Sequence, residues 1–417
     1  MTRLIPAVLR DEPQFRRLFA GMSLSAFGDR ITFVALPFAV LSIGGGAAEV
    51  GIVAAAASVP FIVFTIAGGV VADRVRRHRL MLLTDLVRLV TQAIAATLLI
   101  SGHAEVWHLA ALFAVFGTAD AFFSPAVTGL LPLTVAPHHL QAAGGLRSLV
   151  MSTGMVLGPA AAGVLIAVAG PGYALAVDAA TFAASAAALA TLHPREPEPA
   201  DPGAVPPEAN FLRELREGFA EVRSRSWVWS GLIGIAVYHV VVLPAVFVLG
   251  PVLAQQEYGG ASDWVMVTIG FGVGSIVGDL VVIRLRLARP LFIGTCALIV
   301  ASCQAVVIGS GLPIEAIAAL EAVAGAAVSM YFTLWELSLQ QHIPEGSLSR
   351  VSGLDYTVSS GLMPVGLALA GPASAAFGIH ATLHGMTFIA VPVALALLAV
   401  PAVRALRAPP DAAPGTA

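Results

Sequence analysis

The sequence predicts an all-α integral membrane protein with twelve transmembrane helices in two six-helix repeats. Its 417 residues are 58% hydrophobic and only 11% charged, with a mean hydropathy of +0.87, which is far outside the composition of water-soluble domains. Apolar runs long enough to cross a bilayer recur along the whole chain. The same loop residues return at a constant spacing, which indicates a repeat. The sequence therefore predicts the lipid bilayer as a partner of this chain.

Hydropathy and turn residues place each span in order. A span needs about 20 apolar residues, and each range below is about that long or longer. The expected spans are Leu18–Ser42, Gly51–Ala72, Leu80–Ile100, Trp107–Leu133, Gly145–Ala169, Tyr173–Leu192, Val228–Leu253, Val265–Ile283, Leu291–Ser310, Ile314–Leu339, Gly353–Phe377 and Ala381–Val403.

The arginines indicate the orientation of these spans. They occur near the termini and at every second connection, whereas the alternate connections contain acidic residues and no arginine. Basic connections stay on the cytoplasmic side of a membrane. An even number of spans places both termini on one side, so both termini are predicted to be cytoplasmic.

The loop between the second and third spans contains the densest charge, with four arginines in the six positions 74–79. Such a cluster cannot lie in hydrocarbon, and the glycines before it let two helix ends approach closely. The candidate residues of this loop are Gly69, Asp73, Arg74 and Arg77.

The chain divides into two halves joined by a linker. A shift of 210 residues places Gly68 on Gly278 and Arg74 on Arg284, so the second half contains a diverged copy of the charged loop. Proline and acidic residues after position 193 cannot form a core, and residues 211–225 have the pattern of an amphipathic surface helix. We expect a first half at 1–192, a linker at 193–226 and a second half at 227–417.

The fifth span contains a face of small residues interrupted by a proline: Gly154, Gly158, Pro159 and Gly163. Glycines four or five positions apart allow close helix packing, and a proline inside a helix removes one backbone hydrogen bond and bends it. The alternative interpretation is the small-residue packing found in any membrane protein with several spans.

Ionisable residues inside the spans are the candidate pathway residues, because each is costly there unless it is paired, hydrated or protonated. Asp29 is the first candidate for proton binding, and a structural ion pair is the alternative. His239 is a candidate for substrate or proton contact, and a histidine satisfied by a neighbour is the alternative. The full set is Asp29, Arg30, Asp120, Tyr238, His239, Glu321 and Glu336.

Two further acidic residues in the spans are interpreted as structural. Asp178 is expected to form hydrogen bonds between helices. Asp85 and Arg88 lie three residues apart, which predicts a local ion pair that supports the charged loop.

The loop pattern Gly69-x-x-x-Asp73-Arg74-x-x-Arg77 resembles the signature of the major facilitator superfamily. Short motifs elsewhere resemble its bacterial macrolide-efflux and enterobactin-export branch: Phe27-Gly28-Asp29, Ser124-Pro125-Ala126 and Asp178-Ala179-Ala180-Thr181-Phe182. The resemblance implies the major facilitator fold, with a substrate site at mid-membrane between the halves. It also implies a monomer in a bacterial cell membrane that exports a small hydrophobic molecule, such as a drug, antibiotic or siderophore-like metabolite, by proton antiport.

The fifth-span motif resembles that of antiporters in this superfamily. Two features depart from its usual patterns. Arginine stands at position 76, where many superfamily loops have glycine, and the fourth span has Asp120 but lacks the arginine of many drug:proton antiporters. The usual route of proton coupling is therefore open to question.

Two other functions are alternatives to export. An importer or uniporter of a nutrient is disfavoured by the fifth-span motif, and a transport-inactive receptor by the cost of carboxylates in the spans. The chain has no lysine, which excludes an ATP-binding P-loop, and no histidine or cysteine cluster has metal-ligand spacing. The sequence predicts no enzyme, cofactor, metal or nucleic-acid partner.

The repeat also predicts two ion-pair latches at the cytoplasmic ends of the halves. The resemblance implies that the second span lies beside the eleventh and the fifth beside the eighth. Asp73 to Arg77 would then face Asp355, and Arg147 would face Asp279. The alternative is that these charges only reach the lipid headgroups.

Overall fold

The computed structural model describes residues 6–195, 219–285 and 287–407. Within these residues, twelve helical segments are long and apolar enough to cross a membrane, which confirms the twelve predicted spans. The chain divides into a first unit of Met1–Pro202 with Ala254–Val265 and a second unit of Gly203–Leu253 with Met266–Ala417. The predicted linker and its amphipathic helix lie largely outside the described residues, so the predicted half boundaries stay predictions.

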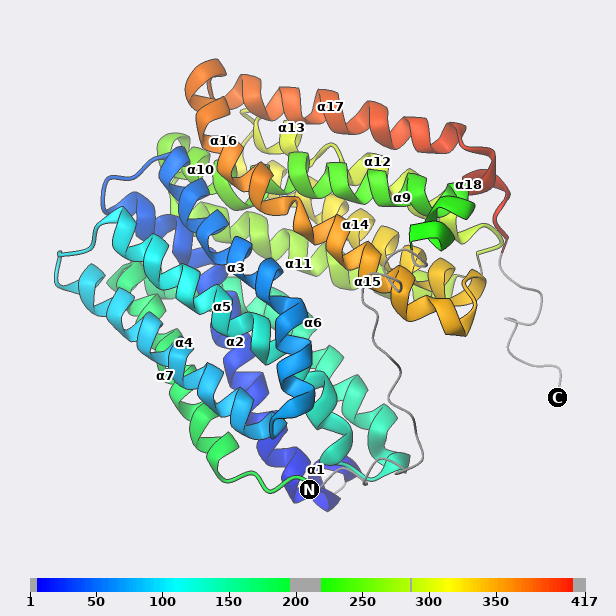
Figure 1. Ribbon diagram of the computed structural model, residues 1–417. Coiled ribbons are helices and arrows are strands. Elements are labelled where there is room, and N and C mark those ends of the chain that lie inside the picture. Colours follow the sequence, from blue (N-terminus) through cyan, green and yellow to red (C-terminus); the bar gives the residue numbers. More distant parts are fainter. Residues whose placement is uncertain (1–5, 196–218, 286, 408–417) are drawn as a thin grey trace. The chain divides into compact units, whose positions relative to one another are not determined.

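The helices up to residue 195 belong to the first unit (Figure 1). Helix α2 packs against α6 and α7, and α4 packs against α5 and α7. Helices α2, α4, α5 and α7 therefore surround the polar side chains described below. The elements are α1 (Ala7–Asp11), α2 (Pro13–Ser42), α3 (Ala47–Arg74), α4 (Arg77–Ile100), α5 (Val106–Leu130), η1 (Leu131–Leu133), η2 (Pro137–His139), α6 (Leu140–Ala169) and α7 (Pro171–Ala190).

The elements after the linker begin with an irregular span. Residues 226–257 form one membrane span built of α-helical and π-helical pieces. The elements are α9 (Ser226–Val237), the π-helices η3 (Tyr238–Val242) and η4 (Ala245–Leu249), α10 (Gly250–Glu257), α11 (Ala261–Arg284), α12 (Pro290–Ala301), α13 (Gln304–Ile308), α14 (Ile314–His342), α15 (Glu345–Gly361), α16 (Met363–Phe377), α17 (Ile379–Ala399) and α18 (Pro401–Ala405).

Glycines allow the same close helix pairing in both units. A Cβ added at Gly117 of α5 would lie 2.0 Å from the carbonyl oxygen of Ala57 in α3. A Cβ added at Gly274 of α11 would lie 1.8 Å from the carbonyl oxygen of Ala322 in α14. Backbones this close leave no room for a side chain. The second and fourth spans thus pair as the eighth and tenth do, which agrees with the repeat in the sequence.

Candidate functional site

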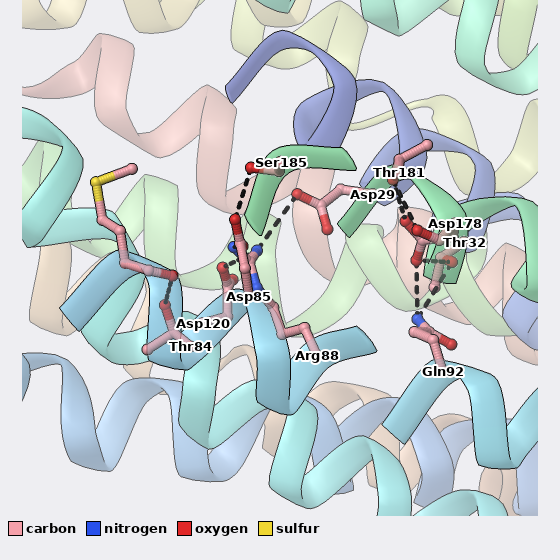
Figure 2. Close-up of polar contacts among 11 residues, drawn as sticks. Asp29, Thr32, Thr84, Asp85, Arg88, Gln92, Asp120, Asp178, Thr181 and Ser185 are labelled. Atoms are coloured by element: carbon pink, nitrogen blue, oxygen red, sulfur yellow. Dashed lines mark hydrogen bonds and ion pairs between the residues drawn. The ribbon is translucent and has the colours of Figure 1, made fainter. Parts of the chain in front are cut away.

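Arg88 lies at the centre of the buried charges in the first unit (Figure 2). Its side chain, on α4, has no solvent exposure. One guanidinium nitrogen, Nη2, donates to Asp85 Oδ1, one turn earlier on the same helix. The other, Nη1, lies 3.2 Å from Asp120 Oδ1 on α5 and 3.8 Å from Asp29 Oδ2 on α2. One guanidinium therefore meets three carboxyl groups from three helices; we call these four residues the arginine cluster.

The surroundings hold this guanidinium in place. Its central carbon lies 3.9 Å from the ring centroid of Phe123 and 4.5 Å from that of Phe182. Aromatic faces attract a desolvated cation, and they also exclude water from it. Ser185 on α7 donates a hydrogen bond of 2.6 Å to Asp85 Oδ2, so the buried Asp85 has a partner on each oxygen.

The carboxyl groups of the cluster differ in access. Asp85 is fully buried, whereas the side chains of Asp29 and Asp120 are 38% and 35% exposed. A group that must take up and release a proton needs a path to water, and a fully buried one lacks it. Asp29 and Asp120 are therefore the members of the cluster with access to solvent.

The arginine cluster contains more acidic groups than basic ones. If Asp29, Asp85 and Asp120 were all ionised, three negative charges would surround one positive charge. Buried charges without a counter-charge are strongly unfavourable. The three carboxyl groups outnumber the one guanidinium cation, so the arginine cluster is not a balanced ion pair.

Asp178 on α7 lies in a neighbouring network and is bonded by uncharged side chains (Figure 2). Its Oδ2 accepts hydrogen bonds from Thr32 on α2 at 2.6 Å and from Gln92 on α4 at 2.9 Å. Thr181, one turn further along α7, donates to Oδ1 at 3.3 Å. The predicted role of Asp178 in hydrogen bonding between helices is confirmed.

Arg30 points away from the arginine cluster, as expected for a residue one position from Asp29 on a helix. It packs against the small-residue face of α6: a Cβ added at Gly158 would lie 2.3 Å from Arg30 Cβ. Gly154, Pro159 and Gly163 of this face are also buried. The glycines therefore set the distance between α2, which contains Asp29, and α6.

A second buried carboxyl group lies in the second unit. Glu321 on α14 is 1% exposed, and its Oε2 accepts a hydrogen bond of 2.8 Å from Gln304 Nε2. The hydroxyl of Tyr238 donates to Gln304 Oε1 at 2.5 Å. No described residue bonds Oε1 of Glu321. The described hydrogen-bond partner of this buried carboxyl group is thus an amide and not a cation.

His239 lies in the π-helix η3 and has a defined tautomer. Its Nδ1 is 2.5 Å from the carbonyl oxygen of Ser359, which only accepts, so Nδ1 bears the hydrogen and Nε2 of the neutral ring is an acceptor. The ring stacks on Phe332 at 5.7 Å and 16°. The alternative interpretation of His239, a histidine satisfied by a neighbour, thus holds for its Nδ1.

The charged loop is tied to its own unit. Arg77 Nη1 donates to the carbonyl oxygen of Gly129 at 2.7 Å, near the C-terminal end of α5. A Cβ added at Gly69 would contact nothing within 4 Å, whereas one at Gly68 would lie 2.4 Å from the carbonyl oxygen of Ala121. The close contact between α3 and α5 is therefore made at Gly68 and not at Gly69. Arg74 is exposed, and the side chain of Asp73 lies outside the description.

Asp279 and Glu336 have hydrogen-bond partners inside their own unit. Asp279 Oδ1 accepts from the hydroxyls of Ser329 at 2.5 Å and Thr333 at 2.9 Å. Glu336 is exposed and accepts from Gln340 at 3.2 Å, so it does not share the buried environment of Glu321. Arg147 and Asp355 are each half-buried. The two latches stay predictions.

Sequence reasoning missed the central place of Arg88. It expected the Asp85–Arg88 ion pair, which is confirmed, but assigned it to support of the charged loop. It also missed Gln92 and Gln304, which connect the carboxyl groups of Asp178 and Glu321 to neighbouring helices. The signal that could have found Gln92 and Gln304 is a polar side chain inside an apolar span. The prediction considered carboxylates in the spans and left out amides.

Comparison with known proteins identifies the family to which the chain belongs. A family model described as the Major Facilitator Superfamily matches residues 18–367. The multidrug efflux pump Tap of Mycolicibacterium fortuitum is 28% identical over 400 residues, covering 93% of this chain and 94% of the pump. Macrolide efflux protein A of Streptococcus pyogenes is 24% identical over 362 residues, covering 85% and 88%. The resemblance predicted from the motifs is confirmed.

Solved structures agree on the fold. A bacterial homolog of the human lysosomal transporter Spinster, in an inward-facing and occupied conformation, has a TM-score of 0.72 at 14% identity and covers 95% of this chain and 98% of its own. The nucleoside transporter NupG has a TM-score of 0.70 at 12% identity, with 93% and 98% covered. At such identities the likeness concerns the fold alone.

Proposed function

Because this chain belongs to the major facilitator superfamily, over residues 18–367, we propose that it exports a small organic molecule in exchange for protons. It is a membrane transporter and not an enzyme. Relatives named multidrug and macrolide efflux pumps align over most of its length, which supports a hydrophobic drug-like substrate and the membrane of a bacterial cell. The same names favour export over nutrient import and over a receptor without transport activity.

The proposed orientation has both termini in the cytoplasm. It rests on the arginines, which occur at alternate connections, and on the retention of basic segments on the cytoplasmic side. We propose that the carrier works as a monomer by alternating access, in which the site opens to one side of the membrane at a time.

The observation that supports proton coupling is the excess of carboxyl groups in the arginine cluster. Asp29 on α2 and Asp120 on α5 both approach the same nitrogen of Arg88 on α4, and both are partly exposed. Deprotonating either one strengthens its attraction to the guanidinium. Binding or release of a proton therefore changes how strongly α2 and α5 are held to α4, which couples a proton to a helix movement.

Transport in vesicles tests this proposal. The purified chain is reconstituted into liposomes, a pH gradient is imposed, and movement of a labelled macrolide is followed together with the internal pH. We expect Asp29→Asn and Asp120→Asn to lower gradient-driven transport by about tenfold or more, because an amide cannot release a proton. Equilibrium binding of the macrolide should persist, since the amide keeps the volume of the carboxyl group.

The matched control is Asp11→Asn, which neutralises an exposed carboxylate outside the spans. It should transport like the unmodified chain. Glu321→Gln tests the second buried carboxyl group in the same assay. Undiminished proton-driven transport in Asp29→Asn, Asp120→Asn and Glu321→Gln alike would contradict proton coupling through any of these groups.

A further inference from the structure

A pocket of about 830 Å³ lies at the arginine-rich end of the first unit. It is formed by the end of α3, the start of α4, the end of α5 and η1, and the end of α7 with the residues that follow it. This end is cytoplasmic in the orientation proposed above. The pocket is separate from the arginine cluster, because none of the four cluster residues lines it.

The wall of this pocket is strongly basic. Five arginines and two histidines line it, and none of the described lining residues is acidic. The basic residues are Arg74, Arg76, Arg77, Arg79, Arg195, His78 and His193.

For three of these arginines, the part of the chain that the structure describes supplies no side-chain partner. Among the described residues, none forms a side-chain hydrogen bond or an ion pair with Arg74, Arg76 or Arg79. The other two are engaged: Arg77 by the carbonyl oxygen of Gly129 at 2.7 Å, and Arg195 by Glu12 at 3.5 Å. Like charges gathered around one cavity repel each other, and an anion inside it would remove that repulsion.

The rest of the wall is apolar. Leucines from α4, α5, η1 and α7 face the same space: Leu82, Leu130, Leu133, Leu189 and Leu192. Basic residues used only to orient the chain need no such enclosure, since they are satisfied by water and headgroups. A cavity lined by both guanidinium groups and leucines matches an anion that also has an apolar part.

We propose that this pocket binds a phosphate group. Guanidinium groups bond phosphate oxygens through paired N–H donors, and several can share one phosphate. Basic pockets between helices on the cytoplasmic side are suited to anionic headgroups. The phosphate comes either from an anionic phospholipid or from a soluble phosphate compound. Because the wall joins four helix ends, a bound phosphate holds these ends together.

Binding to the full-length purified chain tests the site. Retention of phosphatidylglycerol is compared with that of phosphatidylcholine by native mass spectrometry, and binding of inorganic phosphate and ATP is measured in phosphate-free detergent buffer. The variant is Arg74→Gln/Arg76→Gln/Arg79→Gln. The control, Arg223→Gln/Arg284→Gln/Arg289→Gln, removes the same number of exposed arginines outside the pocket.

We expect the pocket variant to weaken binding of one phosphate probe by about tenfold or more and the control to leave it unchanged. A specific loss of phosphatidylglycerol identifies a lipid occupant, and a specific loss of inorganic phosphate or ATP identifies a soluble one. Equal losses in both variants, or no binding of any probe, would overturn the proposal. If the triple variant does not elute as a folded monodisperse protein, Arg76→Gln and Arg79→Gln are measured singly.

Discussion

At the scale of single residues, the guanidinium of Arg88 is the cation on which the buried carboxylate of Asp85 depends. Asp85 has this cation and the Ser185 hydroxyl as its bonded partners, and it has no access to water. Removal of one member of a buried ion pair leaves an uncompensated charge, which costs more than the pair itself contributes. Asp120 and Asp29, by contrast, are partly exposed and can be solvated.

We expect Arg88→Gln to destabilise the protein by about 3–5 kcal/mol, because Asp85 then lies buried without its cation. The double variant Asp85→Asn/Arg88→Gln should recover part of that loss. Thermal denaturation in detergent of the single variants Arg88→Gln and Asp85→Asn, the double variant and the unmodified chain measures the coupling between the two sites. Additive losses, without recovery in the double variant, would show that the two groups do not depend on each other.

At the scale of helices, α6 fixes the position of α2 through glycine. Gly158 lies against Cβ and the backbone of Arg30, and the neighbouring residue on α2 is Asp29. The small-residue face found in the sequence therefore has a specific contact in the structure. Its interpretation as an antiporter motif stays a proposal, and its packing role is observed.

We expect Gly158→Ala to destabilise the protein by about 1–3 kcal/mol, because the new methyl group would lie 2.3 Å from Arg30 Cβ and force α2 and α6 apart. Thermal unfolding in detergent provides the measurement. Gly145→Ala, on the same helix, is the matched control, since a Cβ there meets nothing within 4 Å. It should be neutral or stabilise the helix by up to about 1 kcal/mol. Equal effects of the two substitutions would argue against close packing at Gly158.

At the scale of the whole molecule, the repeat appears in the packing as well as in the loop residues. Gly117 against the carbonyl oxygen of Ala57 in the first unit has its counterpart in Gly325 against the carbonyl oxygen of Phe271 in the second. The charged networks differ, since the first unit has Arg88 among three carboxyl groups and the second has Glu321 bonded to an amide. The repeat thus maintains the scaffold, while the polar chemistry has diverged between halves.

The proposed topology predicts the accessibility of two tags. A tag inserted at Pro206 should react only with cytoplasmic reagents and one at Gly260 only with external reagents, because the arginines occur at alternate connections. Labelling of intact cells and of inverted vesicles with a membrane-impermeant reagent makes the measurement. Reaction of both tags from the same side would be incompatible with twelve spans and the proposed orientation.

The sequence alone determined the class of the protein, the number of spans and the superfamily. Hydropathy, loop charge and short motifs are properties of neighbouring residues, so they can be read without knowing how the helices pack. The same holds for the choice of Asp29 and Asp120 as ionisable candidates, since their cost in a span depends on residue type and position.

Only the tertiary structure decided which of these groups meet. Asp29, Asp120 and Arg88 lie on three helices, and their convergence depends on the rotation and spacing of each helix, which close contacts such as Gly158 on Arg30 set. The basic pocket likewise needs the ends of α3, α4, α5 and α7 at one place. Hydropathy defines which segments enter the membrane, but packing between distant residues defines which side chains face one another there, and that information is not local in the sequence.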